Sequence, residues 1–148
     1  MATTLPPDFS EFLKLLNASR VEYLLIGGHA VAFYGYPRAT GDMDLWVASN
    51  PDNARRLVAV LREFGFAVDA LAPELFEKED TLVRFGIPPM RIELQTSISG
   101  VTFADCYRER LTAIIDGIPI DVIGLRHLKM NKQASGRLKD LADLENLP

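Results

Sequence analysis

The sequence predicts a single mixed α/β domain in which helices flank a largely antiparallel or mixed sheet. Length is the first observation, because 148 residues suit one domain with one core. The second is the order of patterns, since helical spacing and strand-like runs intermix without the regular alternation of βαβ units. The third is Asp116-Gly117 between two apolar runs, which is typical of a β-hairpin turn. We therefore expect residues 1–148 to form one domain.

Composition limits the classes of protein to which the chain can belong. Hydrophobic residues are 48% and charged residues 24% of the chain, as in folded globular proteins. The single cysteine, Cys106, excludes an internal disulfide and suits a reducing compartment. The longest uncharged stretch, 23–37, is shorter than the about 20 apolar residues of a membrane span. Residues 1–10 lack the pattern of a secretory signal, so we expect a cytoplasmic protein without a membrane partner.

The N-terminal part of the chain contains two predicted helices with a strand between them. The first helix is expected to start near Asp8, because Asp8 and Glu11 match a capping box. Its apolar residues share one helical face: Phe9, Phe12, Leu13 and Leu16. Residues 21–26 form an apolar run that is typical of a buried strand. A short helix is expected over 30–34.

The remaining elements follow from alternation, capping and turn signals. Residues 42–47 alternate between apolar and polar side chains, which predicts a strand. Asn50-Pro51 is typical of a helix start, and that helix is expected to end near Gly65. The other predicted elements are strands over 66–68, 81–85 and 91–96, a helix over 103–110, the hairpin over 114–123, and helices over 125–134 and 140–147.

Two carboxylates, Asp42 and Asp44, are the first candidate site residues. In a strand, residues i and i+2 lie on one face about 6.6 Å apart. Two carboxylates held in this way repel each other, and a divalent cation relieves the repulsion by accepting both as hard oxygen ligands. A D-x-D pair by itself is expected about once by chance in this composition. The solvated outer face of an edge strand therefore stays open as an alternative.

Two further features extend this candidate site. The Gly27-Gly28 pair after the first strand permits a close backbone approach, and a helix starting at His29 would offer its free N–H groups to an anion. The surrounding sequence lacks the spacing of a dinucleotide fingerprint or a P-loop. Glu93 shares the carboxylate face if its strand neighbours the 42–47 strand. Asp121, in the hairpin, is the rival third carboxylate.

In combination, these residues resemble the nucleotidyltransferase superfamily of DNA polymerase β. Its signature is a glycine pair after a strand, a short helix, D-x-D on the next strand and a third carboxylate on a later strand. The stretch 25–47, LIGGHAVAFYGYPRATGDMDLWV, carries the likeness, which is especially to small bacterial members near the AbiEii-type toxins. The C-terminal run NKQASGRLKDLADLENL also looks like that branch, through these residues: Lys132, Arg137, Lys139, Asp140 and Asp143.

The resemblance implies a nucleotidyltransferase fold and the transfer of a nucleoside monophosphate from a nucleoside triphosphate to a hydroxyl group of an acceptor. It assigns two Mg²⁺ (or Mn²⁺) ions to Asp42, Asp44 and Glu93, with Asp121 as the rival ligand. It assigns nucleotide binding to six residues: Gly27, Gly28, Arg38, Thr40, Lys132 and Arg137. Many family members carry Gly-Ser in place of the glycine pair and aspartate in place of the glutamate.

The acceptor and other partners are open at this point. The segment 126–139 has five basic residues and no acid, so RNA is a candidate acceptor despite a net charge of −4, beside a protein hydroxyl and a small molecule. The branch also implies the toxin of a toxin–antitoxin pair, with a cognate antitoxin as partner. The alternative is a catalytically inactive nucleotide-binding or protein-interaction module on the same fold.

Overall fold

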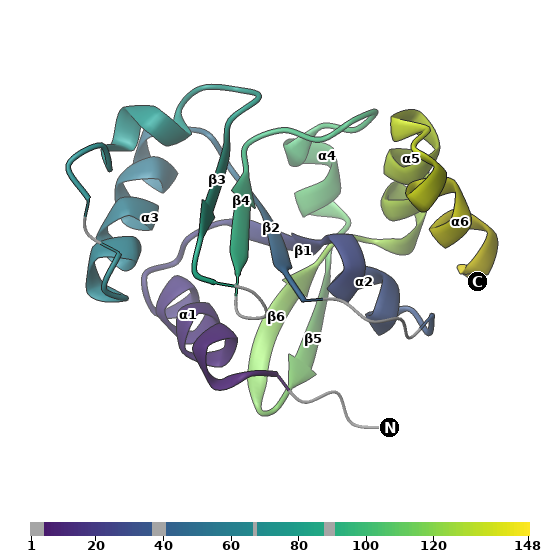
Figure 1. Cartoon of the computed structure of the whole chain (residues 1–148), viewed down its shortest axis with the longest axis horizontal. Helices are drawn as coiled ribbons and strands as arrows, with labels where there is room; N and C mark the ends of the chain where they lie inside the picture. Colours follow the sequence, from purple (N-terminus) through teal and green to yellow (C-terminus); the bar gives the residue numbers. More distant parts are fainter. Residues whose placement is uncertain (1–4, 37–40, 67, 88–90) are drawn as a thin grey trace.

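A computed structural model describes residues 5–36, 41–66, 68–87 and 91–148, and it shows one mixed sheet with helices on both faces (Figure 1). The helices are α1 (Pro7–Ala18), α2 (Gly27–Phe33), α3 (Pro51–Glu63), α4 (Phe103–Arg108), α5 (Leu125–Ser135) and α6 (Leu138–Asn146), with a 3-10 helix, η1 (Pro73–Phe76). The strands are β1 (Tyr23–Ile26), β2 (Met43–Val47), β3 (Leu82–Phe85), β4 (Ile92–Gln95), β5 (Leu111–Ile115) and β6 (Ile118–Val122). The mixed α/β fold class is confirmed.

The six strands are arranged in the order β3-β4-β2-β1-β6-β5. The β1–β2, β3–β4 and β5–β6 pairs are antiparallel, whereas β1–β6 and β2–β4 are parallel. The two parallel pairs form between strands that are distant in the chain, and they place β2 and β4 side by side in the middle of the sheet. The part of β2 that carries Asp44 therefore lies next to the part of β4 that carries Glu93.

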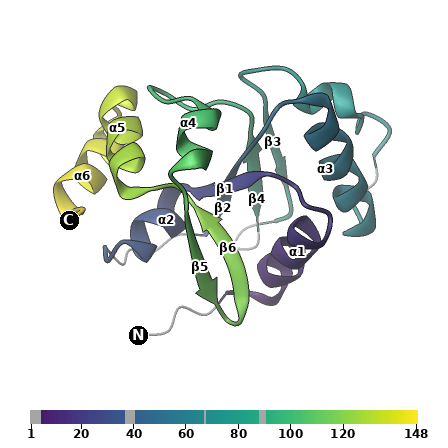
Figure 2. The same cartoon turned by 180° about the vertical axis from the view of Figure 1, so that it is seen from behind.

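The two faces of the sheet are covered by different helices. One face carries Met43 and Leu45, and it is covered by α1 and α3, as the ring contact between Phe12 and Phe85 at 5.4 Å shows. The opposite face carries Asp44 and Trp46, and Trp46 packs edge-on against Phe103 of α4 at 5.2 Å. Figure 2 shows the molecule from behind, with α5 and α6 at the end opposite α3.

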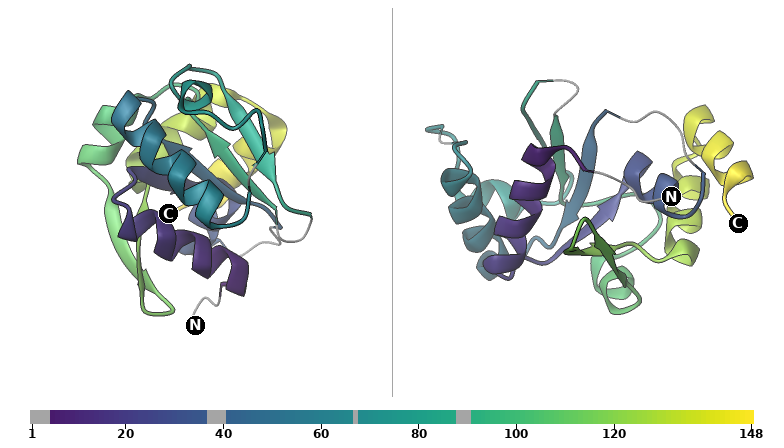
Figure 3. Two further views of the ribbon diagram at one scale, coloured as in Figure 1. Left: turned by 90° about the vertical axis from the view of Figure 1, so that its left-hand side faces the viewer. Right: turned by 90° about the horizontal axis from the view of Figure 1, so that it is seen from below.

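The hairpin prediction is confirmed in its turn geometry. Asp116 and Gly117 both have positive φ angles, of 52° and 77°, as a two-residue type I′ turn requires. The turn joins Ile115 to Ile118, which are paired across the hairpin. Figure 3 shows this hairpin projecting at the edge of the molecule.

One predicted strand, 66–68, is wrong. Phe66 donates its N–H to the carbonyl of Leu61, which closes the last turn of α3, and its ring packs against Phe85 with centroids 4.9 Å apart. Phe66 and Val68 are outside any strand, and residue 67 lies outside the described residues. Phe66 is apolar because it covers the core. It does so from the end of a helix, without pairing in a sheet.

Three helix starts also differ from their predictions. Helix α1 begins at Pro7, and Asp8 makes no side-chain cap, because proline in the first turn already has a helical φ. Helix α2 begins at Gly27, directly after β1, so the glycine pair is its first turn rather than a loop before it. Helix α6 begins at Leu138 instead of residue 140. Within the described residues, no helix is long and apolar enough to cross a membrane.

Candidate nucleotidyl-transfer site

The first turn of α2 approaches the carboxylates closely. Gly27 has a φ of +67°, which favours glycine. A Cβ at Gly27 would lie 2.9 Å from both Cβ and Cγ of Asp44 and closer still to Oδ2. Only a residue without a side chain permits this approach. The glycine pair therefore has a physical reason at this turn, and both glycines line the same pocket as Asp44.

Sheet register brings the predicted carboxylates together. Asp44 lies opposite Ile26 of β1 on one side and opposite Glu93 of β4 on the other. The Asp44 and Glu93 side chains leave the same face of the sheet, and Glu93 acts directly on the protonation of Asp44. Asp42 precedes β2 by one residue, and its charge acts on Asp44. The structure thus brings Glu93, which is far along the chain, next to the Asp42 and Asp44 pair.

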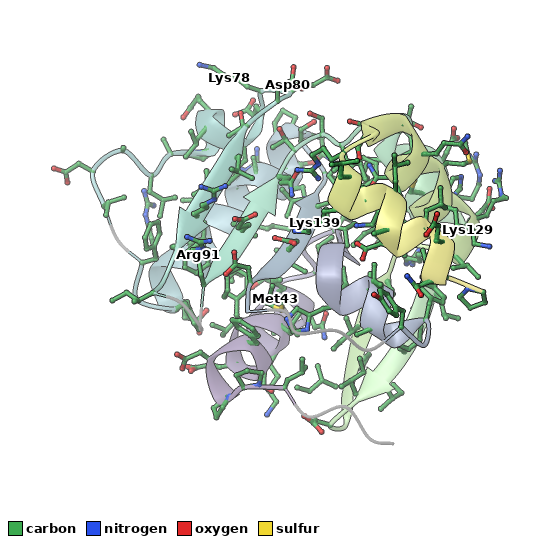
Figure 4. The ribbon with its side chains drawn as sticks, turned by 45° about the vertical axis from the view of Figure 1, so that its right-hand side comes forward. Met43, Lys78, Asp80, Arg91, Lys129 and Lys139 are labelled. Atoms are coloured by element: carbon green, nitrogen blue, oxygen red, sulfur yellow. The ribbon has the colours of Figure 1, made fainter. Side chains whose placement is uncertain are left out.

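Arginines already compensate two of the three carboxylates. Arg91 donates from Nη2 and Nε to Oδ2 of Asp42, at 2.8 and 3.2 Å. Arg84 donates from Nε to Oε1 of Glu93 at 2.7 Å. Figure 4 shows Arg91 on the sheet, above Met43. Among the residues that the structure describes, no cation is bonded to Asp44, and its buried Oδ1 has no hydrogen-bond partner.

The environment of Asp44 raises its pKa to about 7. Burial is the largest cause, followed by the hydrogen bond to Glu93 and repulsion from Glu93 and Asp42. The Lys139 ammonium opposes these effects and lowers the pKa. A carboxyl group with this pKa still holds a proton in part of the molecules near neutral pH. A metal cation that displaced the proton would gain a carboxylate ligand whose charge is only partly offset by Lys139.

Asp44→Asn is expected to stabilise the metal-free protein above neutral pH by about 2–4 kcal/mol. Because the folded-state pKa is raised, the native state keeps a proton that the unfolded state has released, and wild-type stability falls as pH rises from about 4 to about 7. Asparagine does not titrate, so the variant lacks this loss. Urea unfolding of both proteins at about pH 5 and about pH 8 measures this pH-dependent loss of stability, with Asp121→Asn as the control. Identical pH dependence in wild type and Asp44→Asn would contradict the assignment.

A pocket of about 380 Å³ lies beside Asp44. Its sheet side is formed by β1, β2 and β4, and its opposite side by the α5–α6 pair. Three basic side chains line it: Lys132, Arg137 and Lys139. Figure 4 shows Lys139 toward the middle of the molecule and Lys129 at its outer edge. Lys139 was not among the predicted binding residues, although it belongs to the Lys-Asp pair in the C-terminal pattern. Only the placement of α6 shows that Lys139 lies at the pocket.

Lys132 is buried in a charged cluster between α5 and α6. Its Nζ donates to Oδ1 of Asp140 and Oδ2 of Asp143, each at 3.0 Å. Burial alone would raise the pKa of Asp140, but hydrogen bonds from Ser135, Lys132 and Arg137 lower it to about 2. The charge of Lys132 is thus already matched inside the protein. Arg137 bonds Asp140 at 2.8 Å, but its side chain is 75% exposed beside the pocket.

Other predicted site residues lie elsewhere. Asp121 accepts a hydrogen bond from Oγ1 of Thr112 at 2.7 Å and faces Arg110 at 3.5 Å, and it does not line the pocket. Of the two rival carboxylates, Glu93 is the one beside Asp44. Arg38 and Thr40 lie outside the described residues.

The carboxylates match a magnesium ion in donor chemistry but not in their present spacing. All three supply hard oxygen ligands. Burying the Oδ1 atom of Asp44 without a partner is unfavourable, and a bound metal ion would give this oxygen a partner. Within the residues that the structure describes, no three acidic, histidine or cysteine side chains are close enough to hold a metal ion as they stand. Binding therefore requires at least one of these side chains to move from its present position.

Comparison with known proteins rests on structure alone. No family model and no curated protein matches this sequence. A candidate nucleotidyltransferase of Thermotoga maritima superposes with a TM-score of 0.65 and 15% identity, over 97% of this chain and 94% of that one. An antigenic nucleotidyltransferase-like protein of Paracoccidioides brasiliensis superposes with a TM-score of 0.54 and 18% identity, over 93% and 73%. The chain therefore has a nucleotidyltransferase-like fold.

Proposed function

We propose that this protein is a metal-dependent nucleotidyltransferase, which moves a nucleoside monophosphate from a nucleoside triphosphate to a hydroxyl group. One observation carries the proposal: Asp44 lies between Gly27 and Glu93 and lines a pocket whose opposite wall carries basic side chains. A carboxylate cluster suits a cation, and a basic wall suits phosphate. A nucleoside triphosphate with its metal ion combines both chemistries in one ligand.

The carboxylates would hold Mg²⁺ or Mn²⁺ through Asp42, Asp44 and Glu93. When bound, the metal supplies Lewis-acid stabilisation of the phosphate charge and lowers the pKa of a hydroxyl nucleophile. Asp44 would give up its proton on binding, because a cation at this position would offset the burial and the carboxylate repulsion that raise its pKa. Arg91 and Arg84 form ion pairs with Asp42 and Glu93 in the metal-free protein.

The phosphates would lie between the glycine turn and the α5–α6 wall. Gly27 and Gly28 expose backbone at the pocket, with no side chain in the way. Lys139 and Arg137 face the same space and would neutralise the triphosphate. We keep Lys132, Arg38 and Thr40 as proposed nucleotide-binding residues, with Lys132 acting from within its aspartate cluster.

We propose only the chemical class of the acceptor. The basic segment 126–139 borders the pocket through α5 and the start of α6, which favours RNA over an uncharged small molecule. A toxin of the AbiEii type, acting in the cytoplasm and neutralised by a cognate antitoxin, is the biological role that the sequence resemblance suggests. The second candidate function is a non-catalytic nucleotide-binding or protein-interaction module. The Arg91–Asp42 and Arg84–Glu93 pairs favour it, because they satisfy two carboxylates without any metal.

Labelled nucleotide transfer separates the two functions. Each nucleoside triphosphate, labelled at the α-phosphate, is incubated with cell extract, Mg²⁺ and wild type, Asp44→Ala or Asp121→Asn. We expect label on one macromolecule with wild type and Asp121→Asn, and a loss of at least about 10²–10³-fold with Asp44→Ala. Nuclease and protease digestion then identifies the acceptor. Equal labelling by wild type and Asp44→Ala would overturn the assigned role of Asp44.

A melting experiment distinguishes an inactive binding module from an enzyme. A ligand that binds the native state raises its melting temperature. A shift with nucleoside triphosphate and Mg²⁺, without label transfer to any acceptor, would support the module. No shift with any nucleotide would contradict both the enzyme and the nucleotide-binding module, and only the protein-interaction module would be left.

A further inference from the structure

Strand β5 is an edge strand without the protection that such strands usually carry. Among the described residues, it forms one end of the sheet and pairs with β6 alone. Its five residues, Leu111–Ile115, include no charge and no proline, and Leu111 and Ile114 are 46% and 67% exposed. Soluble proteins usually place lysine, proline or a bulge on an exposed edge, because open backbone groups recruit another strand. The other edge strand, β3, carries Arg84.

The hairpin geometry decides which backbone groups of β5 are open. In a two-residue hairpin the residues flanking the turn, Ile115 and Ile118, exchange hydrogen bonds, and every second pair does the same. The backbone groups of the other β6 residues point away from β5. Ile123, directly after β6, continues this alternation, and its N–H donates to the Leu25 carbonyl on the side of β1. By the same alternation, the N–H and C=O groups of Thr112 and Ile114 point outward from the sheet.

We propose that β5 pairs antiparallel with β5 of a second copy of this chain, about a two-fold axis at Ala113. This register places Thr112 opposite Ile114 of the other copy, so that all outward groups of both residues bond across the interface. Centring the axis on Thr112 or on Ile114 would leave part of these groups unpaired. The two sheets would then join into one continuous sheet. The proposal is independent of the function proposed for the pocket.

Side chains favour the same register. On one face the exposed Ile114 meets Thr112 of the other copy, and on the opposite face Leu111 meets Ile115. Residue Arg110, just before the strand, comes level with Asp116 of the other copy, in the turn, and the pair occurs twice by symmetry. Within its own chain Arg110 lies 3.5 Å from Asp121 and Asp116 accepts the Leu5 N–H, so the opposite charges at both ends would add to these contacts and favour this register. A heterologous strand would match this pattern only by chance, whereas a second copy matches it by symmetry.

Disulfide trapping tests the register directly. At a two-fold axis, Ala113 forms a non-hydrogen-bonded pair with itself, at a Cα separation of about 4.5 Å that a disulfide spans. Ala113→Cys is expected to cross-link into dimers under mild oxidation with diamide. Leu111→Cys, on the same strand and face, is the matched control because it faces Ile115 of the other copy. Wild type controls for the buried Cys106.

Sedimentation of the unmodified chain tests the dimer itself. We expect a reversible dimer whose fraction rises with concentration, since the interface is only one strand wide. Ile114→Lys should abolish it, and Ile87→Lys, at a position 81% exposed outside the hairpin, should not. Circular dichroism and melting temperature verify that both variants fold. A chain that stays monomeric at the highest concentration overturns the proposal, as does a dimer that Ile114→Lys leaves intact. Equal cross-linking of Leu111→Cys and Ala113→Cys overturns the register.

Discussion

Gly27→Ala is expected to destabilise the protein by about 2–5 kcal/mol and to reduce nucleotide transfer by at least about 10²-fold. Two costs contribute to the loss of stability. Alanine at a φ of +67° costs about 1–2 kcal/mol in backbone strain, and its Cβ overlaps Asp44, which costs about 1–3 kcal/mol more. Asp44 must move to relieve the overlap, and a displacement of about 1 Å at a reacting centre costs about 10²-fold in rate.

Gly35→Ala separates the two costs. Gly35 also has a positive φ, of +105°, but a Cβ there meets no atom within 4 Å. We expect this control to show only the backbone cost in urea unfolding and to retain transfer activity. Combining Gly27→Ala with Asp44→Ala removes the overlap, so the double variant should be more stable than the sum of the two single effects predicts. Additive effects would mean that the glycine is required for a reason other than Asp44.

Lys132→Met is expected to destabilise the protein by about 3–5 kcal/mol, because it leaves two carboxylates buried beside each other without their shared cation. Lys132 and both aspartates are nearly inaccessible, with side chains 5%, 3% and 3% exposed. Solvent therefore screens little of the resulting repulsion. Helix α6 would also lose its main polar link to α5, and Lys139 would no longer be held toward Asp44.

The pH dependence identifies the mechanism of this loss. The Asp140 pKa of about 2 lies below the value in the unfolded chain, so its contribution is present above about pH 4 and is lost as pH falls toward 2. The gap in unfolding free energy between wild type and Lys132→Met should therefore narrow in acid. Lys129→Met, at the outer edge of α5, is the control. Replacing Asp140 and Asp143 by asparagine in the Lys132→Met background should recover part of the stability. A gap that is the same at all pH values would mean that Lys132 acts through packing rather than charge.

Local patterns predicted the parts of the site that depend on one strand or one turn. Alternation placed Asp44 and Trp46 on the same face of β2, and the register of β2 confirms it. The hairpin followed from Asp116-Gly117 because few residues tolerate positive φ at both turn positions. Glu93 was expected beside Asp44 only if two strands were neighbours, and the sheet order satisfies that condition.

Features that depend on distant packing were not predictable from single segments. The choice between Glu93 and Asp121 required the strand order, since both have strand-like surroundings. The burial of Lys132 depends on two aspartates of the next helix, and a lysine in a basic segment is ordinarily solvated. Likewise His127, in the same basic segment, is buried at 4% exposure, because its face of α5 packs inward.

The parallel pairing of β2 with β4 has a consequence for folding. The ion pair between Arg91 and Asp42 joins residues 49 positions apart, and the intervening chain contributes α3, η1 and β3. Closing so long a loop has an entropic cost that is recovered only after most of the sheet has formed, which slows the step. Hydrogen-exchange labelling during refolding should therefore show protection of the β5–β6 amides before those of β4. A nascent chain would acquire its anionic cluster only once nearly two thirds of its length had left the ribosome.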